Sequence, residues 1–173
     1  QAAKRNEDVF HIAADYVNIS GFTIRRAYDA AGIRIESDFC NVSNNICSNN
    51  IDGINIRYSN NNSITNNDCS YNRFGIYLSN SNNNSIINNN CLKNKYDGVR
   101  IDGSSNNKIT NNNICSNDDG IYLVGSRNNS ITNNNCSYNY FEGIGLSYSN
   151  NNSIINNNCS YNRFGIYLSN SNN

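Results

Sequence analysis

The sequence predicts an all-β fold, a single-stranded parallel β-helix built from about seven to eight coils of about 22 residues. The first observation is a glycine followed by an alternating apolar triplet, which recurs at intervals of 21 to 23 residues. The recurring glycines are Gly32, Gly53, Gly75, Gly98, Gly120, Gly143 and Gly165. A repeat of this length is typical of a solenoid. The second observation is that each repeat has only period-2 apolar patterns, so its coils consist of strands and turns.

One domain is expected over residues 1–173. Residues 1–8 are polar and form either a short cap or a frayed end, and residues 9–31 form an opening coil. Residues 32–173 form the regular coils, the last of which stops part-way through a turn. A solenoid needs a cap over the apolar surface of its terminal coil. Further coils or another domain of the same parent protein are therefore expected to follow.

A second inward-facing apolar position and a pair of asparagines follow six of the seven glycine motifs. The apolar position is occupied by Val42, Ile64, Ile86, Ile109, Ile131 and Ile154. The first asparagine of each pair is Asn44, Asn66, Asn88, Asn111, Asn133 or Asn156. Amides stacked at the strand spacing of about 4.8 Å form hydrogen bonds from coil to coil. We therefore expect these asparagines to form a ladder along the axis, and a further near-column comprises Asn50, Asn72, Asn94, Asn139 and Asn162.

A cysteine column comes next, and it comprises Cys47, Cys69, Cys91, Cys136 and Cys159. In the coil between Cys91 and Cys136, Ile114 has the column spacing while Cys115 keeps the local pattern, and Ile114 is expected to point inward. The column is interpreted as a structural ladder of buried thiols, with stacked disulfides and a metal site as the alternatives. Parallel Cβ vectors suit disulfide geometry poorly. Cys40, outside the column, is expected to be the most exposed thiol.

The central residue of the apolar triplet points outward and forms a candidate glycan-binding column. Its members include Tyr77, Arg100, Tyr122 and Tyr167. Tyrosines on alternate coils lie about 9 to 10 Å apart, which is close to the length of a disaccharide. We expect a polysaccharide to lie along the axis against these four residues. The alternative interpretation is that tyrosine is simply a favourable exposed strand residue.

Acidic residues precede several of the glycines, namely Asp52, Asp97, Asp119 and Glu142. Carboxylates in consecutive coils are able to share Ca²⁺ or act as an acid and base pair. Turn acids beside a glycine are the more ordinary explanation. No catalytic residue, metal ligand or cofactor is therefore predicted.

The composition excludes several partners. Thirteen basic residues balance thirteen acidic residues, so the formal charge is zero and no basic patch is present for a nucleic acid. No apolar stretch approaches the roughly 18 residues of a membrane span, so none is expected in this segment.

Several phrases resemble the NosD-like parallel β-helix repeats, which are grouped with carbohydrate-binding and sugar-hydrolase β-helices and occur in surface proteins of methanogenic archaea. These are residues 15–24, Asn-Ser-Ile-Thr-Asn-Asn and Gly-Ile-Tyr-Leu-Ser-Asn-Ser. The resemblance implies a right-handed β-helix and an extracellular or cell-surface location. The family name suggests copper, but a copper chaperone needs exposed soft or imidazole ligands. The chain has one histidine, His11, and no methionine.

Two functional hypotheses remain. The favoured one is a structural or adhesive cell-surface module, with a polysaccharide or cell-envelope glycan along its outer face. The alternative is a catalytic or non-catalytic fragment of a polysaccharide lyase or hydrolase of the pectin-lyase-like fold. An enzyme should interrupt the repeat with long loops where its site is built, whereas here the coil length varies by only one residue either way. The residues at 58–83 and 148–173 are also nearly identical, as expected for an array lengthened by duplication.

Overall fold

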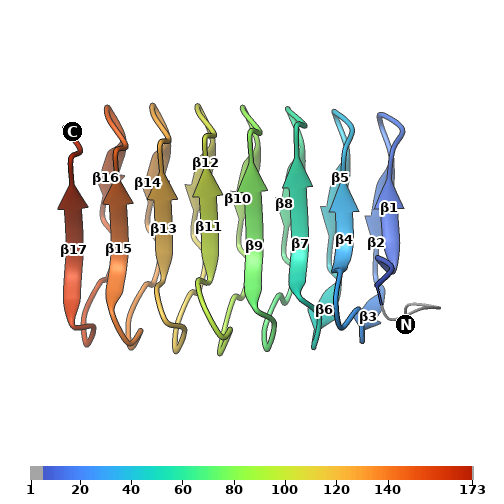
Figure 1. The fold of residues 1–173 in the computed structure, drawn as a ribbon, viewed down its shortest axis with the longest axis horizontal. Coiled ribbons are helices and arrows are strands. Elements are labelled where there is room, and N and C mark those ends of the chain that lie inside the picture. The colour runs from blue at the N-terminus through green and yellow to red at the C-terminus, as the bar shows by residue number, and fades with distance from the viewer. Residues whose placement is uncertain (1–5, 173) are drawn as a thin grey trace.

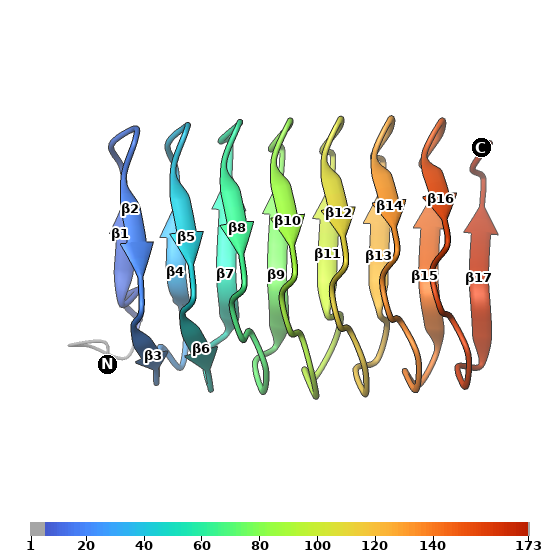
Figure 2. The ribbon, with the colours of Figure 1, turned by 180° about the vertical axis from the view of Figure 1, so that it is seen from behind.

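The computed structural model describes residues 6–172, and this part of the chain forms a parallel β-helix with no α-helix (Figures 1 and 2). The fold class predicted from the repeat is confirmed. Residues 1–5 of the expected cap lie outside the described residues, as does Asn173.

Two large parallel sheets run along the axis on opposite sides of the rod. The first has eight strands: β1 (Phe10–Ile12), β4 (Ala31–Ile35), β7 (Asp52–Arg57), β9 (Phe74–Ser79), β11 (Val99–Asp102), β13 (Ile121–Val124), β15 (Glu142–Ser147) and β17 (Phe164–Ser169). The second has seven: β2 (Asn18–Ser20), β5 (Asn41–Ser43), β8 (Ser63–Thr65), β10 (Ser85–Ile87), β12 (Lys108–Thr110), β14 (Ser130–Thr132) and β16 (Ser153–Ile155). Each strand pairs with the equivalent strand of the next coil.

A short third face lies between the end of the seven-stranded sheet and the next coil. It contains β3 (Thr23–Arg25) and β6 (Ile46–Ser48), and isolated bridges from Ile46 to Asn158 continue it. Within residues 6–172, no helix is long and apolar enough to span a membrane.

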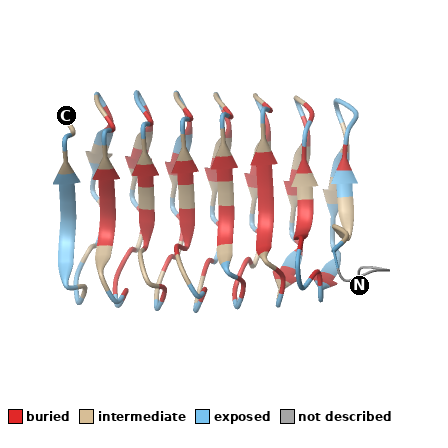
Figure 3. Cartoon of the chain, viewed as in Figure 1, coloured by how far each residue is buried: buried red, intermediate tan, exposed pale blue. Residues whose placement is uncertain are grey.

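The core is a set of aliphatic columns, because the period-2 alternation turns every second side chain inward. Equivalent residues stack directly: Ile54 pairs with Ile76, and Ile64 pairs with Ile86. These side chains are completely buried, and Figure 3 shows the strands in the middle of the rod largely buried. The recurring glycines allow the coils to approach, since a Cβ on Gly32 would lie 2.8 Å from the carbonyl oxygen of Gly53. Spacing in the sequence thus maps directly onto contacts between neighbouring coils.

The amide ladder lies one residue later than the sequence suggested. The asparagines expected to form it, namely Asn44, Asn66, Asn88, Asn111, Asn133 and Asn156, are exposed and have φ values of 54 to 56°. Asparagine tolerates this left-handed conformation, and it directs the side chain outward. The ladder is formed by the second asparagine of each pair, namely Asn45, Asn67, Asn89, Asn112, Asn134 and Asn157.

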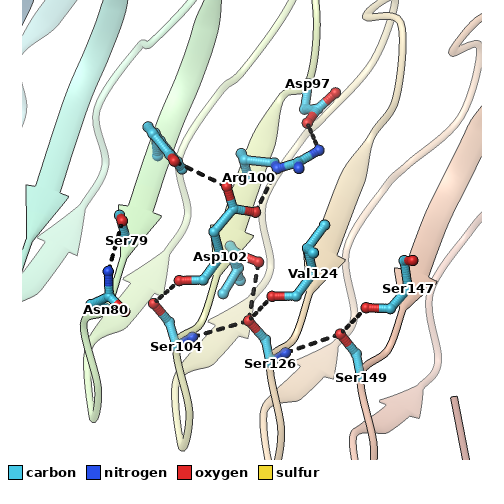
Figure 4. A network of polar contacts seen from close by, with 12 residues as sticks. Ser79, Asn80, Asp97, Arg100, Asp102, Ser104, Val124, Ser126, Ser147 and Ser149 are labelled. Carbon is cyan, nitrogen blue, oxygen red and sulfur yellow. Dashed lines mark hydrogen bonds and ion pairs between the residues drawn. The ribbon is translucent and has the colours of Figure 1, made fainter.

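Three more columns of polar side chains run along the other turns. The near-column that begins at Asn50 forms a second amide ladder, in which Asn117 fills the gap left in the sequence pattern. A third amide ladder begins at Asn62. Serine hydroxyls form a fourth column, with Ser104, Ser126 and Ser149 in succession (Figure 4). These side chains accept the backbone N–H groups of the turns, which would otherwise be buried without partners.

The cysteine column faces the core. Cys47, Cys69, Cys91 and Cys136 are completely buried, and Cys159 is half-buried. Ile114 occupies the column position in its coil and Cys115 is half-buried, as the spacing indicated. Burial and the neighbouring thiols raise the pKa of Cys69 well above its ordinary value.

The expectation that Cys40 is the most exposed thiol is wrong, because Cys40 is only 2% exposed. Its backbone N–H donates to Oδ1 of Asn62, so it stands in the third amide ladder one coil before the first asparagine. Its Sγ lies 3.4 Å from the Ser37 hydroxyl. The small side chain of Cys40 therefore occupies the position that an asparagine side chain has in the following coils.

Candidate functional site

The outer face of the eight-stranded sheet brings together most of the residues proposed to bind a glycan. Parallel register places Tyr77 beside Arg100, and Arg100 beside Tyr122. Gly145 separates Tyr122 from Tyr167, which lies on β17. Three of the four candidates are therefore contiguous, and Tyr167 lies two coils away.

Tyr77, Arg100 and Tyr122 form a connected cluster rather than a row of independent rings. The guanidinium carbon of Arg100 lies 4.9 Å from the Tyr122 ring centroid. Gly145 leaves room for this ring, because a Cβ there would lie 2.6 Å from Cδ2 of Tyr122. Tyr77 and Tyr122 are half-buried, whereas Tyr167 is exposed. Tyr77 and Tyr122 are thus partly accessible on a shared surface.

Arg100 is held by two carboxylates (Figure 4). Its Nε donates to Oδ1 of Asp102 at 2.7 Å, and its Nη1 lies 3.3 Å from Oδ2 of Asp97. The Tyr77 hydroxyl donates to Oδ2 of Asp102 at 3.0 Å, so Asp102 joins two coils. Burial and the charge of Asp102 raise the pKa of Tyr77. This network fixes the orientation of both side chains at the surface.

A groove lies beside this network. It has a volume of about 360 Å³ and is lined by Ile51, Asp52, Arg57, Arg73, Phe74, Tyr77, Arg100 and Asp102. A second hollow of about 300 Å³ adjoins it and shares Arg73, Phe74 and Arg100. Tyr96, Asp97, Asp118 and Asp119 complete the second hollow. The two hollows together extend along the axis over several coils.

The acidic residues that precede the glycines line the same face. Asp52 and Asp97 are buried, and Asp119 and Glu142 are half-buried. Burial raises the pKa of Asp97 to about 7, with Arg100 opposing the shift and Asp119 adding to it. Burial, the hydrogen bond to Asp119 and the charge of Asp119 raise the pKa of Glu142 to about 8. Two carboxyls beside the second hollow therefore titrate near neutral pH.

Arg57, Arg73, Phe74 and Asp102 are groove residues that the sequence reasoning did not identify. Arg73 is in the turn before β9 and Phe74 is the first residue of that strand, at the position where other coils have an acidic residue. The signal for them is the repeated Arg-Phe-Gly-Ile-Tyr-Leu phrase, which places Arg163 over Phe164 in the same way as Arg73 over Phe74. The guanidinium-to-centroid distance is 5.4 Å in each pair.

The residues present do not fit a copper site. Within residues 6–172, no three histidine, cysteine, aspartate or glutamate side chains are placed to hold a metal ion. The Nε2 atom of His11 lies 2.9 Å from Oε2 of Glu36. The thiols in the column face the core, where the deprotonated form that binds metal is disfavoured.

Solved structures similar to this chain are β-helix proteins. The periplasmic alginate epimerase AlgG, as its T265N T268M double mutant, has 28% identity and a TM-score of 0.76 over 86% of this chain and 38% of its own length. The A-module of the mannuronan C-5 epimerase AlgE4 from Azotobacter vinelandii has 18% identity and a TM-score of 0.74, covering 96% of this chain and 57% of that one. The enzymatically active domain of tailspike protein 2 from bacteriophage CBA120 has 14% identity and a TM-score of 0.69, covering 89% of this chain and 35% of that one.

These similarities show a right-handed parallel β-helix of the pectin-lyase-like type, as the resemblance implied. The chain spans about a third to somewhat over half of the length of these proteins. None of the curated proteins matches. The model of one protein family, described as periplasmic copper-binding protein (NosD), matches residues 16–173. This match covers nearly the whole chain, and the chain therefore belongs to the NosD family.

Proposed function

We propose that this chain is a polysaccharide-binding β-helix module of the cell envelope, which holds a glycan along the outer face of the eight-stranded sheet. The observation that carries the proposal is the groove, in which aromatic and guanidinium side chains from successive coils line one continuous face. Sugar rings bind to aromatic surfaces, and guanidinium groups donate hydrogen bonds to hydroxyls and anionic groups.

The similar structures support a polysaccharide as the ligand. AlgG is named as an alginate epimerase and AlgE4 as a mannuronan epimerase, so both act on polysaccharides. AlgG is also described as periplasmic, as is the NosD family, which supports an envelope location. We propose a structural or adhesive role at the cell surface, because a rod of stacked coils presents the same face repeatedly and allows weak contacts to act together.

The test measures binding of the full chain to a panel of neutral and acidic polysaccharides. We expect Tyr77→Ala, Tyr122→Ala and Arg100→Ala each to weaken binding several-fold, and Tyr167→Ala to weaken it only for long polymers. Tyr148→Asn is the matched control, because Tyr148 is 66% exposed at a turn where the equivalent residues of other coils, Asn80 and Asn170, are asparagines. If all four variants bind as well as the parent, this face does not hold the glycan.

The alternative of a polysaccharide lyase or hydrolase is favoured by one observation. Asp97 and Glu142 have pKa values near neutrality and lie beside the groove, as an acid and base pair would require. Incubation of the chain with the polymers that it binds, followed by measurement of new chain ends, distinguishes the two functions. Cleavage that is lost in Asp97→Asn and Glu142→Gln would establish the enzyme.

A further inference from the structure

The first part of the groove contains positive charge that the protein itself does not neutralise. Three guanidiniums from neighbouring coils line it: Arg57 at the end of β7, Arg73 in the turn before β9 and Arg100 on β11. Arg100 is paired with Asp97 and Asp102. The other two guanidiniums determine which ligand the groove suits.

Arg57 and Arg73 have no carboxylate at ion-pair distance anywhere in residues 6–172. The Nε of Arg57 donates to the amide oxygen of Asn55 at 2.9 Å. The guanidinium of Arg73 lies 5.4 Å from the Phe74 centroid and 5.2 Å from the Tyr96 centroid. Both contacts orient a guanidinium without neutralising its charge.

Arg34 provides an internal comparison, since it stands in the same outer face. Its Nε lies 2.7 Å from Asp8, and its Nη1 lies 3.6 Å from Glu36. Carboxylates thus neutralise Arg34 on this face, whereas Arg57 and Arg73 line the groove without such a partner among residues 6–172.

Asp52 is the one carboxylate of the groove that is not bound to Arg100, and it opposes an anionic ligand only weakly. It is buried, it accepts a hydrogen bond from the Asn55 amide, and burial raises its pKa. Arg57 and Arg73 both favour its ionised form, so its charge offsets one of the two guanidiniums at most. Three arginines and two aspartates line the groove itself, so it keeps a positive excess of one charge even when Asp52 is ionised, while Asp97 lines the adjoining hollow.

We propose that the groove binds an anionic sugar residue, with its negatively charged group on Arg57 and Arg73 and its ring against Phe74 and Tyr77. This inference rests on the proposed function, because it names the chemical class of the polysaccharide that the face holds. The planar guanidinium matches the geometry of carboxylate, sulfate and phosphate groups, and paired arginines on one groove select such groups.

The second hollow restricts how the polymer lies. Asp97 in its lining is paired with Arg100, whereas Asp118 and Asp119 have no ion pair within residues 6–172 and repel a second anionic residue at that point. The residue next to the anchored one therefore projects its uncharged edge toward these acids.

The experiment compares three polymers on the full chain: polygalacturonate, its carboxyl-reduced form and dextran sulfate. Dissociation constants are measured by isothermal titration calorimetry at low and high salt. The variants are Arg57→Gln/Arg73→Gln, the charge-retaining Arg57→Lys/Arg73→Lys and the control Arg25→Gln/Arg127→Gln, which removes two exposed arginines outside the groove. Thermal melts establish that each variant is folded.

We expect polygalacturonate to bind at least about tenfold more tightly than its carboxyl-reduced form. The glutamine variant should lose this preference, the lysine variant should recover part of it and the control should bind like the parent. Binding of dextran sulfate alone, with the same dependence on Arg57 and Arg73, would support the anion site and identify a sulfate ester as its ligand.

Equal binding of the acidic and reduced polymers, unaffected by the glutamine variant, would overturn the anion site and leave the proposed function intact. If none of the three polymers binds while a neutral polysaccharide of the panel does, this inference fails and the proposed function stands; if no polysaccharide binds, both fail.

Discussion

At the scale of single residues, burial controls the chemistry of the cysteines. Five of the seven, Cys40 among them, are buried, and only Cys115 and Cys159 are half-buried. The hydrogen bond with Cys136 lowers the pKa of Cys159, whereas burial raises that of Cys69. Thiolate is the reactive form of cysteine, so accessible and buried members of the column should differ strongly in reactivity.

We predict that thiol reagents modify Cys115 and Cys159 first in the folded chain. Intact-mass spectrometry under non-reducing conditions should find about two rapidly modified groups before unfolding and all seven after it. The variant Cys115→Ser/Cys159→Ser should show almost no rapid modification. Fewer than about five reactive groups in the unfolded chain would indicate disulfides and contradict a column of free thiols.

Asp97 should make the folded state less stable as the pH rises. Its pKa is about 7 in the folded chain, above the ordinary value of 3.8, because it is buried and lies near Asp119. Below pH 3.8, Asp97 is protonated in both the folded and the unfolded chain. Between the two pKa values the unfolded chain has released the proton and the folded chain has not, so the free energy of unfolding falls until about pH 7.

We predict that Asp97→Asn removes most of this loss and is more stable than the parent at pH 8 by at least about 1 kcal/mol. Urea unfolding at a series of pH values measures the effect. The free energy of unfolding of the variant should still decrease with pH, though by less, because the pKa of Glu142 is also raised. Identical pH profiles for the two chains would contradict the burial of an ionisable group at this position.

At the scale of the elements, side-chain hydrogen bonds stabilise the turns, whereas backbone hydrogen bonds stabilise the strands. Asn89 is an example: its Oδ1 accepts the N–H of Asn67 at 2.9 Å, and its Nδ2 donates to the carbonyl of Ile64 at 2.9 Å. Asn88, directly before it, is exposed with a φ of 56°. Neighbouring asparagines thus have different roles, one in hydrogen bonding and one in backbone conformation.

We predict that Asn89→Ala costs about 2 to 4 kcal/mol of stability, because it leaves buried backbone groups in two coils without partners. Asn88→Gly is the matched control and should change the stability by less than about 1 kcal/mol, since glycine adopts a positive φ readily. Chemical denaturation of both variants tests the difference. A larger cost at Asn88 would mean that the first asparagine of the pair forms the ladder.

At the scale of the whole molecule, each coil contacts only its neighbours, so local stability should vary along the rod. Central strands have a paired strand on each side, as β7 has β4 and β9, whereas within residues 6–172 β17 pairs only with β15. Ile166 on β17 is 50% exposed, while the equivalent Ile76 on β9 is completely buried. Figure 3 shows β17 as an exposed strand at the end of the rod.

We predict that the amides of β7 and β9 exchange with solvent at least about 100-fold more slowly than those of β17. Hydrogen exchange followed by mass spectrometry of peptides from each coil measures this gradient. Ile166→Ser should leave the exchange of β7 unchanged. Uniform protection along the rod would show that the coils open only together.

The sequence by itself determined the period, the strand-and-turn composition and the inward columns. In a solenoid each residue contacts the equivalent residue about 22 positions away, so a repeat in the sequence is also a repeat in space. The same reasoning placed Ile114 inward and brought Tyr77, Arg100 and Tyr122 onto one face.

Only the tertiary structure decided the details that depend on direction at the turns and on contacts across coils. Asn88 has a left-handed backbone conformation, so its side chain points outward and that of Asn89 points inward. Two adjacent asparagines in a sequence do not reveal which of them has this conformation. Arg100 is neutralised by Asp97 and Asp102 of its own coil, whereas the guanidinium of Arg73 lies over Phe74 and over Tyr96 of the next coil. The groove is lined by residues of three successive coils, and the repeat in the sequence does not show which of their side chains pair.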